Sequence, residues 1–223
     1  MEKILLLIFI LISSLSTAQV QHRVRDFSPD YYGIVYVTDD TSDYFFEGWI
    51  SIYEKNTNKE LIKVESSVIH FDSLNEEIQA GMFDTSFSDE YFIYYDDFNF
   101  DGVKDFAIAD THEGSYGTHT YRIYLAEGDK FVFNEKFSEL GSEYLGMFYI
   151  QTGKKIIQAY NKSGCCYHEF YEFTVKNNTP VMISKVTEDA TKDAKYVYIK
   201  TERLINGKWV KKERKELIED YYK

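Results

Sequence analysis

The middle of the chain carries a pattern of side chains whose types and spacing predict a specific chemistry. Its positions one, three, five, seven and nine are Asp97, Asn99, Asp101, Val103 and Asp105. Four of these positions offer a side-chain oxygen, the seventh offers a backbone carbonyl, and a glycine at position six allows a sharp turn. This is the spacing of the first nine residues of an EF-hand-type calcium loop, which gathers about 6–8 oxygen ligands around the ion. We therefore predict that these five residues bind Ca²⁺.

The flanks of this loop differ from those of an EF-hand. Position twelve is Ile108, where an EF-hand has a bidentate Glu. The stretches on either side, 91–95 and 106–109, are aromatic or β-favouring and predict strands. We expect a calcium loop that joins two strands and braces the structure. The competing interpretation is a solvated acidic turn rich in Asn, Asp and Gly.

The N-terminal residues predict export. An apolar run, 4–12, is followed by small residues that end at Ala18, which is typical of a secretory signal peptide. The apolar run is too short to span a bilayer. We expect cleavage of residues 1–18, no membrane insertion afterwards, and a single all-β domain over 19–223 that is periplasmic or secreted.

The composition favours an all-β protein that does not bind nucleic acid. The chain has 20 Tyr and 17 Phe but only 2 Pro, and short turns separate its aromatic-rich runs. Its formal charge of −12 argues against nucleic acid and anionic membrane surfaces as partners. The same charge suits a basic partner or metal ions.

Most of the chain reads as consecutive hairpins. Strands are expected at 31–38, 46–55, 60–66, 105–110, 121–126, 130–135, 144–151, 155–160, 167–176, 181–188, 195–205 and 208–218. One short helix is expected at 73–81, where a Ser and a Glu could form a capping box. These elements predict an all-β fold, an antiparallel hairpin meander that forms a sandwich, a barrel or a small propeller-like domain.

The last hairpin has the clearest local signal. The Asn206–Gly207 pair is typical of a two-residue turn between strands. The register that this turn implies sets Glu202 opposite Lys211. It also sets Lys200 opposite Glu213, so that both pairs join opposite charges across the strands.

Two loops are candidates for contact with a protein partner. The first contains Ser115, Tyr116 and His119, which we expect at the surface; an ordinary Gly-rich connector is the alternative. The second contains Ser163 and Tyr167. A calcium-braced scaffold would hold such loops in place and so lower the entropy that is lost on binding.

The two cysteines of the chain are neighbours, Cys165 and Cys166. In an exported protein two thiols usually pair, and here the bond would close a small ring. The preferred interpretation is a structural turn that holds either two thiols or a vicinal disulfide. A redox catalyst, a metal site, a stiffened binding loop, or a Cys nucleophile with His168 as its base are the functional alternatives.

Four landmarks occur in order along the chain: Asp97–Asp105, 114–117 followed by Tyr121, 145–148, and 162–168. Together they resemble exported bacterial proteins related to an immunity protein of type IV secretion killing systems. That relative is a calcium-binding β-protein that inhibits a lysozyme-like effector. The resemblance implies a calcium site at the five loop positions and a partner surface made by one or both candidate loops.

The second candidate loop carries a further resemblance. Ser163, Gly164 and Tyr167 fit the S-G-x-x-Y pattern of periplasmic lysozyme inhibitors, in which a loop serine enters the cleft of the enzyme. The vicinal cysteines are not part of that pattern. The resemblance implies a peptidoglycan hydrolase or lysozyme as the partner.

The chain lacks the common catalytic motifs, such as GxSxG, HExxH, a Walker loop or GxGxxG. We therefore expect a protein that is not an enzyme, a calcium-binding inhibitor or immunity protein of the cell envelope. The alternatives are a carbohydrate- or surface-binding β-module, suggested by the aromatic-rich strands, and a hydrolase with an unrecognised site.

Overall fold

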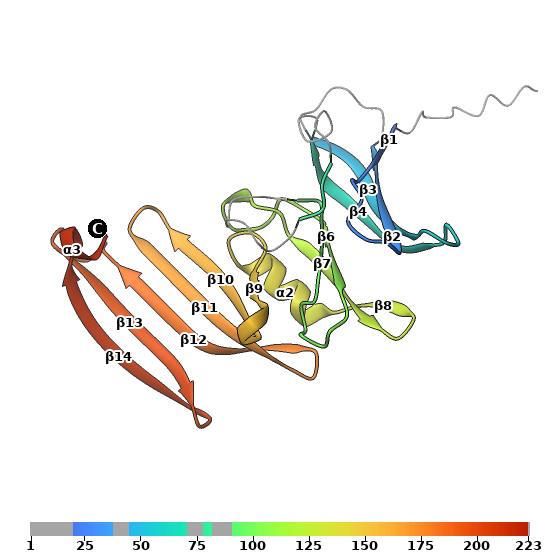
Figure 1. The fold of residues 1–223 in the computed structure, drawn as a ribbon. Helices are drawn as coiled ribbons and strands as arrows, with labels where there is room; N and C mark the ends of the chain where they lie inside the picture. The colour runs from blue at the N-terminus through green and yellow to red at the C-terminus, as the bar shows by residue number, and fades with distance from the viewer. Residues whose placement is uncertain (1–19, 38–44, 71–77, 82–90, 223) are drawn as a thin grey trace, which may run out of the picture.

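The computed structural model describes residues 20–37, 45–70, 78–81 and 91–222. Within these ranges the chain forms three antiparallel sheets and two α-helices (Figure 1). The predicted signal peptide lies outside the described residues, as does most of the helix expected at 73–81. The last four residues of that segment, 78–81, are described and form no helix.

Consecutive strands build each sheet. The first sheet contains β1 (Val20–Arg23), β2 (Tyr31–Val37), β3 (Phe45–Glu54) and β4 (Glu60–His70). The second contains β5 (Ile93–Asp96), β6 (Asp105–Ala109), β7 (Tyr121–Glu127) and β8 (Lys130–Phe133). The third contains β9 (Tyr149–Gln151), β10 (Ile156–Ser163), β11 (Tyr167–Lys176), β12 (Thr179–Asp189), β13 (Tyr196–Ile205) and β14 (Lys208–Leu217). Within each sheet every strand pairs with its neighbours along the chain, so the predicted all-β antiparallel meander is confirmed.

The first and second sheets pack against each other through one face of each. Side chains alternate along a strand, so that Val35 of β2 and Ile50 of β3 turn inward and are 0% exposed. Phe106 of β6 is also 0% exposed. Its ring meets that of Tyr31, on β2, edge-on at a centroid distance of 5.7 Å. The interior between these sheets is therefore apolar and filled.

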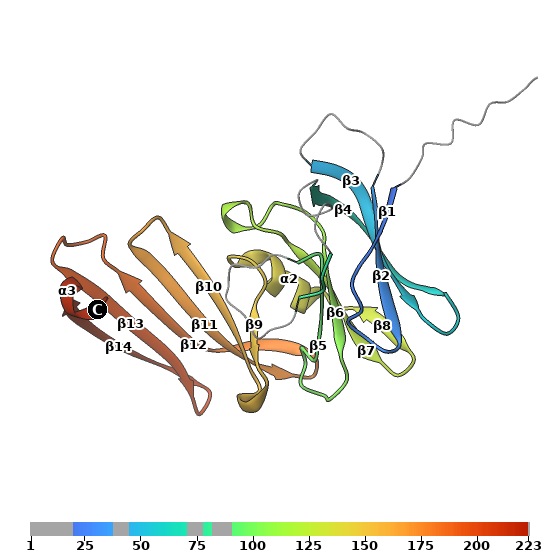
Figure 2. The ribbon, with the colours of Figure 1, turned by 45° about the horizontal axis from the view of Figure 1, so that its top comes forward.

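Helix α2 (Glu135–Glu143) lies between the second and third sheets and packs on β7 and β12 (Figure 2). Its N-cap is Asn134, whose Oδ1 accepts a hydrogen bond from the Phe137 amide at 3.0 Å. Phe137 and Leu140 are buried at helical spacing. The expectation of a strand at 130–135 and no helix after it is wrong here: the strand ends at 133. Nine residues with a glycine among them gave only a weak helical signal.

Beyond β12 the third sheet extends away from the rest of the molecule (Figures 1 and 2). Its last strand, β14, is exposed along its first eight residues. The short helix α3 (Ile218–Tyr221) follows it and contacts β13 and β14. No helix among the described residues has the length and apolar character needed to cross a membrane.

The hairpin predicted around Asn206–Gly207 is confirmed. Both residues have positive φ, 51° and 76°, as a two-residue hairpin turn requires. Glu202 pairs with Lys211, and Lys200 with Glu213, as the turn implies. The Lys211 Nζ lies 2.8 Å from a carboxylate oxygen of Glu202. A strand that the sequence analysis missed is β1, which pairs with β2 at the edge of the first sheet.

The position of Phe137 between two sheets predicts a large packing penalty for its removal. Phe137→Ala should lower the free energy of unfolding by about 3–5 kcal/mol, because it leaves a cavity in a filled interior. The matched control is Phe133→Ala, since Phe133 is 48% exposed, and its effect should stay below about 1 kcal/mol. Urea denaturation of the two variants measures the difference. Equal effects would contradict the layered arrangement around α2.

Candidate functional site

The predicted calcium loop connects β5 to β6; its residues 98–100 are buried and its residues 101–104 are exposed. Phe98 and Phe100 point into the core and are 0% and 8% exposed. The ring of Phe98 meets the ring of Phe148 edge-on at 5.6 Å. Val103 lies on the other side and is 53% exposed. The apolar residues thus anchor the loop, while the positions between them remain available for polar contacts.

Hydrogen bonds within the loop hold it in a tight curve. The two carboxylate oxygens of Asp97 accept from the amides of Asp101, at 3.0 Å, and Gly102, at 2.9 Å. Asp101 Oδ1 accepts from the amide of Val103 at 2.8 Å. Gly102 has a φ of +95°, which a residue with a Cβ rarely adopts. This is the turn for which the calcium-loop pattern places glycine at position six.

Asp105 is the best-buried member of the set and is 0% exposed. Its Oδ2 accepts from the Phe98 amide at 2.8 Å, and its Oδ1 accepts from the Ala126 amide at 2.9 Å. Burial raises the pKa of this carboxyl to about 7, against the effect of the two amides, and the charges of Asp101 and Asp97 raise it further. Asp105 therefore braces the base of the loop and ties it to β7.

The donors of the loop fit the chemistry of Ca²⁺. Three carboxylates, one amide oxygen and one carbonyl lie on nine residues, and all are hard oxygen ligands. Two nearby lysines make other contacts than with the loop carboxylates: Lys104 Nζ lies 5.3 Å from the centre of the Tyr95 ring, and Lys155 Nζ donates to the Phe100 carbonyl of the loop at 3.1 Å. Among the described residues, no three His, Cys, Asp or Glu side chains converge on one point as metal ligands would. Calcium at this loop thus stays a prediction.

The loop is also attached to the third sheet. Asn99 Nδ2 donates to Asn178 Oδ1, in the turn between β11 and β12, at 3.1 Å. Asn134, the cap of α2, donates from its side chain to the Asn178 carbonyl at 3.0 Å. The loop therefore lies where the second sheet, α2 and the third sheet meet, and its conformation is coupled to all three.

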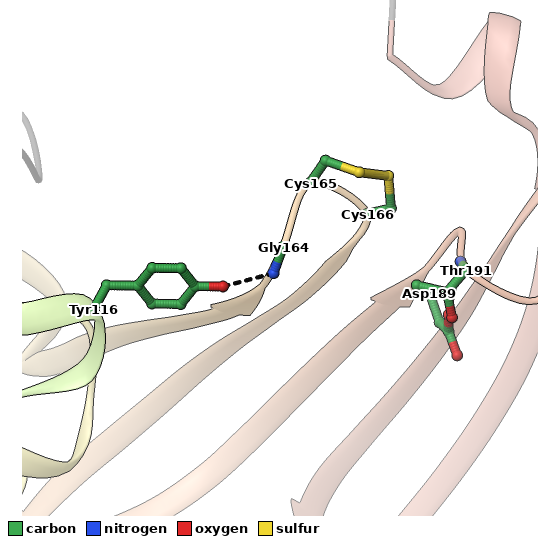
Figure 3. Close-up of a disulfide and its surroundings, with 6 residues drawn as sticks. All are labelled: Tyr116, Gly164, Cys165, Cys166, Asp189 and Thr191. Atoms are coloured by element: carbon green, nitrogen blue, oxygen red, sulfur yellow. Dashed lines mark hydrogen bonds between the residues drawn. A yellow bond between two sulfur atoms is a disulfide. The ribbon is translucent and has the colours of Figure 1, made fainter.

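The two candidate partner loops lie side by side, although they are far apart in the sequence (Figure 3). The Gly164 amide donates to the Tyr116 hydroxyl oxygen at 2.6 Å. Ser115 Oγ donates to Asn161 Oδ1 at 3.2 Å. Lys162 Nζ lies 5.1 Å from the centre of the Tyr116 ring. We call the surface formed by 115–116 and 161–167 the joined-loop surface.

The most exposed aromatic residue of the joined-loop surface is Tyr116, at 61%. Its φ of 59° is unusual for a residue with a side chain, and it lies within the 3₁₀ turn Ser115–Gly117. Cys165 and Cys166 are joined by a disulfide, and the Cys166 carbonyl accepts from the Ala190 amide at 2.8 Å (Figure 3). Contacts on both sides therefore hold the cysteine turn in position.

His119 was expected at the surface but lies in the interior. It is 3% exposed, so the expectation of a surface residue that touches a partner is wrong. Its ring lies 4.6 Å from that of His112 and stacks on Phe92 at 6.3 Å. The alternation along the short segment that leads into β7 turns this side chain toward the core. His119 supports the loop from inside.

Glu169 is a residue of this region that the sequence analysis missed. Its Oε1 accepts from the Tyr167 hydroxyl at 2.9 Å, and its Oε2 accepts from the Tyr171 hydroxyl at 2.7 Å. Lys185 Nζ lies 2.6 Å from Oε1. Burial raises the pKa of Glu169, but the hydrogen bonds from Lys185, Tyr171 and Tyr167 together outweigh it, so that the pKa is lowered. Residues 167, 169 and 171 lie on one face of the same strand, and this alternation is the signal from which the role of Glu169 could have been predicted.

The comparisons with known proteins support the fold. No family model matches the chain, and a search of the curated proteins finds no match. Among solved structures, the chain is similar to one titled "Structure of a Xanthomonas Type IV Secretion System related protein". The two share 22% sequence identity over 90% of this chain and 95% of that chain, with a TM-score of 0.67. At this identity the likeness shows a shared fold.

The network around Glu169 predicts a pH-dependent contribution to stability. The folded pKa lies below the unfolded value of about 4.5. The carboxylate therefore stabilises the fold above the unfolded pKa, and this stabilisation is lost as pH falls through the folded pKa. Glu169→Gln should lower the free energy of unfolding by about 1 kcal/mol at pH 7, and the difference from wild type should vanish in acid.

Urea denaturation in steps from about pH 7 down to pH 2 measures this effect. The control is Glu127→Gln, because Glu127 is exposed at the end of β7. A Glu169→Gln effect that is the same at every pH would show that the loss comes from packing and not from the charge.

Proposed function

We propose that this chain is a non-catalytic, calcium-binding protein of the cell envelope that inhibits a lysozyme-like peptidoglycan hydrolase. The neighbour with the same fold is described as related to a type IV secretion system, which supports a role in that context. In this proposal the chain acts as an immunity protein, and the joined-loop surface enters the cleft of the enzyme.

The observation that carries the proposal is the meeting of two loops that the sequence analysis had singled out separately. Tyr116 and Gly164 are 48 positions apart and are joined by a hydrogen bond of 2.6 Å. Exposed Tyr side chains are common anchors of protein interfaces, and a pre-ordered loop loses less entropy on binding. The disulfide of Cys165 and Cys166 restricts the same turn.

Charge supports a basic partner. The chain carries a formal charge of −12, and lysozymes are often basic, so long-range attraction would speed association. At the joined-loop surface itself, the Lys162 ammonium group lies over the Tyr116 ring. The inhibitor would thus approach the enzyme through its overall charge and recognise it through the aromatic loop.

Calcium has a bracing role in this proposal. An ion held by Asp97, Asn99, Asp101 and the Val103 carbonyl would offset the repulsion between the loop carboxylates. Because Asn99 also bonds to the turn at Asn178, the ion would stabilise the junction that positions the third sheet. The third sheet carries one of the two loops of the joined-loop surface.

This proposal predicts that calcium stabilises the mature protein. At a calcium concentration a hundredfold above Kd, the free energy of unfolding should rise by about 2.7 kcal/mol relative to chelator. Asp101→Ala should abolish this gain and change little in chelator. Thermal unfolding with calcium and with chelator, together with calorimetry of binding, measures the effect.

Asp105→Ala is the contrasting variant. It leaves the buried amide of Phe98 and the half-buried amide of Ala126 without their acceptor, so it should cost about 2–4 kcal/mol even in chelator. An equal loss for Asp101→Ala with and without calcium would contradict a metal site at this loop.

Inhibition should depend on Tyr116. In a cell-wall clearing assay with c-, g- and i-type lysozymes and bacterial lytic enzymes, the mature protein should inhibit at least one of them. Tyr116→Ala should weaken that inhibition about tenfold or more, while Tyr116→Phe keeps the ring, loses the acceptor for Gly164 and should weaken it less.

The control for this series is Trp209→Ala, since Trp209 is 44% exposed but lies beside the Asn206–Gly207 turn, at the opposite end of the third sheet from the cysteine turn. A wild-type protein that neither binds nor inhibits any enzyme of the panel would remove the proposal. Inhibition that survives Tyr116→Ala unchanged would place the contact on another surface.

A carbohydrate-binding module remains a second candidate because of the outer face of the first sheet. Tyr36 stacks on Trp49 at 4.8 Å, and Tyr32 stacks on Tyr53 at 5.1 Å. The hydroxyls of Tyr36 and Tyr53 are 2.8 Å apart, so all four rings share one face. Binding of cell-wall glycans that is lost in Trp49→Ala would favour this candidate over inhibition.

A further inference from the structure

Strand β14 is a long, open edge of the third sheet. It has ten residues, and the first eight of them are exposed. It pairs with β13 on one side, and no described strand pairs with its other side. Alternate residues of such an edge direct their backbone N–H and C=O groups outward, where another strand can bind them.

The turn before β14 determines which residues of the strand direct their backbone groups to the open edge. Ile205 and Lys208 close the two-residue Asn206–Gly207 turn and therefore exchange hydrogen bonds with each other. Trp209, one residue further, then directs its backbone groups to the open edge. The same alternation directs those of Lys211 and its successors at every second position outward.

The strand is basic in an acidic protein. Its sequence, KWVKKERKEL, has five Lys or Arg and two Glu, whereas the whole chain has a formal charge of −12. Ion pairs join Lys211 to Glu202 and Arg214 to Glu216. Within the described residues these pairs leave Lys208 without a salt bridge, and Lys212 likewise.

Apolar side chains are exposed beside these cations. Ile205, Trp209 and Val210 are 50%, 44% and 40% exposed at the turn end of the hairpin. A groove of about 340 Å³ runs over the strand pair, lined by Thr201, Arg203, Ile205, Val210, Lys212, Glu213 and Arg214. Its lining combines two aliphatic side chains with three cations.

We propose that β14 binds an extended acidic segment of a partner protein as an additional strand. Backbone groups of the segment pair with the open edge, its carboxylates lie beside Lys208 and Lys212 on one face, and its apolar residues lie on the other face, where Trp209 is exposed. The net negative charge of the whole chain disfavours an acidic segment on most of the surface, whereas the five Lys or Arg residues of β14 attract it. This inference concerns a surface separate from the joined-loop surface and is independent of the proposed inhibition.

The charge of the strand also disfavours a second copy of this chain as the occupant. Two β14 strands that met edge to edge would bring ten Lys or Arg residues and four Glu residues together, twice the content of one strand. Lysines on an edge strand are a known protection against such self-pairing. An acidic segment would not meet this repulsion, because its carboxylates are attracted to the Lys and Arg side chains of β14.

Fluorescence anisotropy tests the proposal with a labelled ten-residue peptide that alternates Glu and Val. The mature protein should bind this peptide, and binding should weaken about tenfold in the double variant Lys208→Glu, Lys212→Glu. The matched control is Lys59→Glu, Lys130→Glu, which changes the net charge equally at exposed positions of other strands and turns. It should keep most of the affinity.

Two altered peptides separate strand addition from simple charge attraction. The same peptide N-methylated at alternate residues keeps its charges but loses backbone donors, so it should not bind. A Lys–Val peptide should not bind either. Equal affinity for the N-methylated peptide, or no binding of the Glu–Val peptide, would overturn the proposal. A dimer that the double variant abolishes in light scattering would overturn it in favour of a second copy.

Discussion

The burial of Phe98, Phe100 and Asp105 in the loop between β5 and β6 is the constraint on which the arrangement of the sheets depends. Phe98 occupies the interior against Phe148, while Asp105 is buried only because two backbone amides satisfy its carboxylate. A buried carboxylate without such partners would cost several kcal/mol. In the rest of the loop, Asp97 and Asp101 accept hydrogen bonds from the loop amides and hold it in a tight curve.

From this junction the position of the joined-loop surface follows. The loop bonds to Asn178, which belongs to the turn between β11 and β12, and α2 bonds to the same residue through Asn134. The third sheet is therefore docked at one end on the calcium-type loop. At the other end of β10 and β11 it presents the cysteine turn to Tyr116. A calcium ion at the loop would rigidify the third sheet, which carries the cysteine turn at its other end.

Local signals in the sequence were sufficient for the strands and turns. The Asn206–Gly207 turn requires two positive φ values, few residue pairs supply them, and the register of the last hairpin follows directly. The loop at 97–105 was recognisable for a similar reason, because its glycine and its oxygen donors follow a fixed spacing. Helix α2 was missed since its stability comes from Phe137 and Leu140 packed between two sheets, which a nine-residue window does not reveal.

Contacts between distant segments were beyond local reasoning. Nothing in the segments around Tyr116 and Gly164 says that they touch, because only the packing of the second sheet on the third brings them together. Burial of His119 has the same origin, since a loop residue turns inward when the core offers a place beside Phe92. The candidate site was therefore predicted residue by residue, but its assembly into one surface came from the fold.

Hydrogen exchange with mass spectrometry on the mature protein in calcium, alone and with an inhibited lysozyme-like enzyme, tests the central claim most directly. The account predicts that amides at 114–118 and 161–167 become protected together when the enzyme is added. The amides at 97–105 should be protected to the same degree in both samples, because calcium is present in each. Protection of neither loop in the complex, or of one loop without the other, would contradict the account that the two form a single surface for the partner.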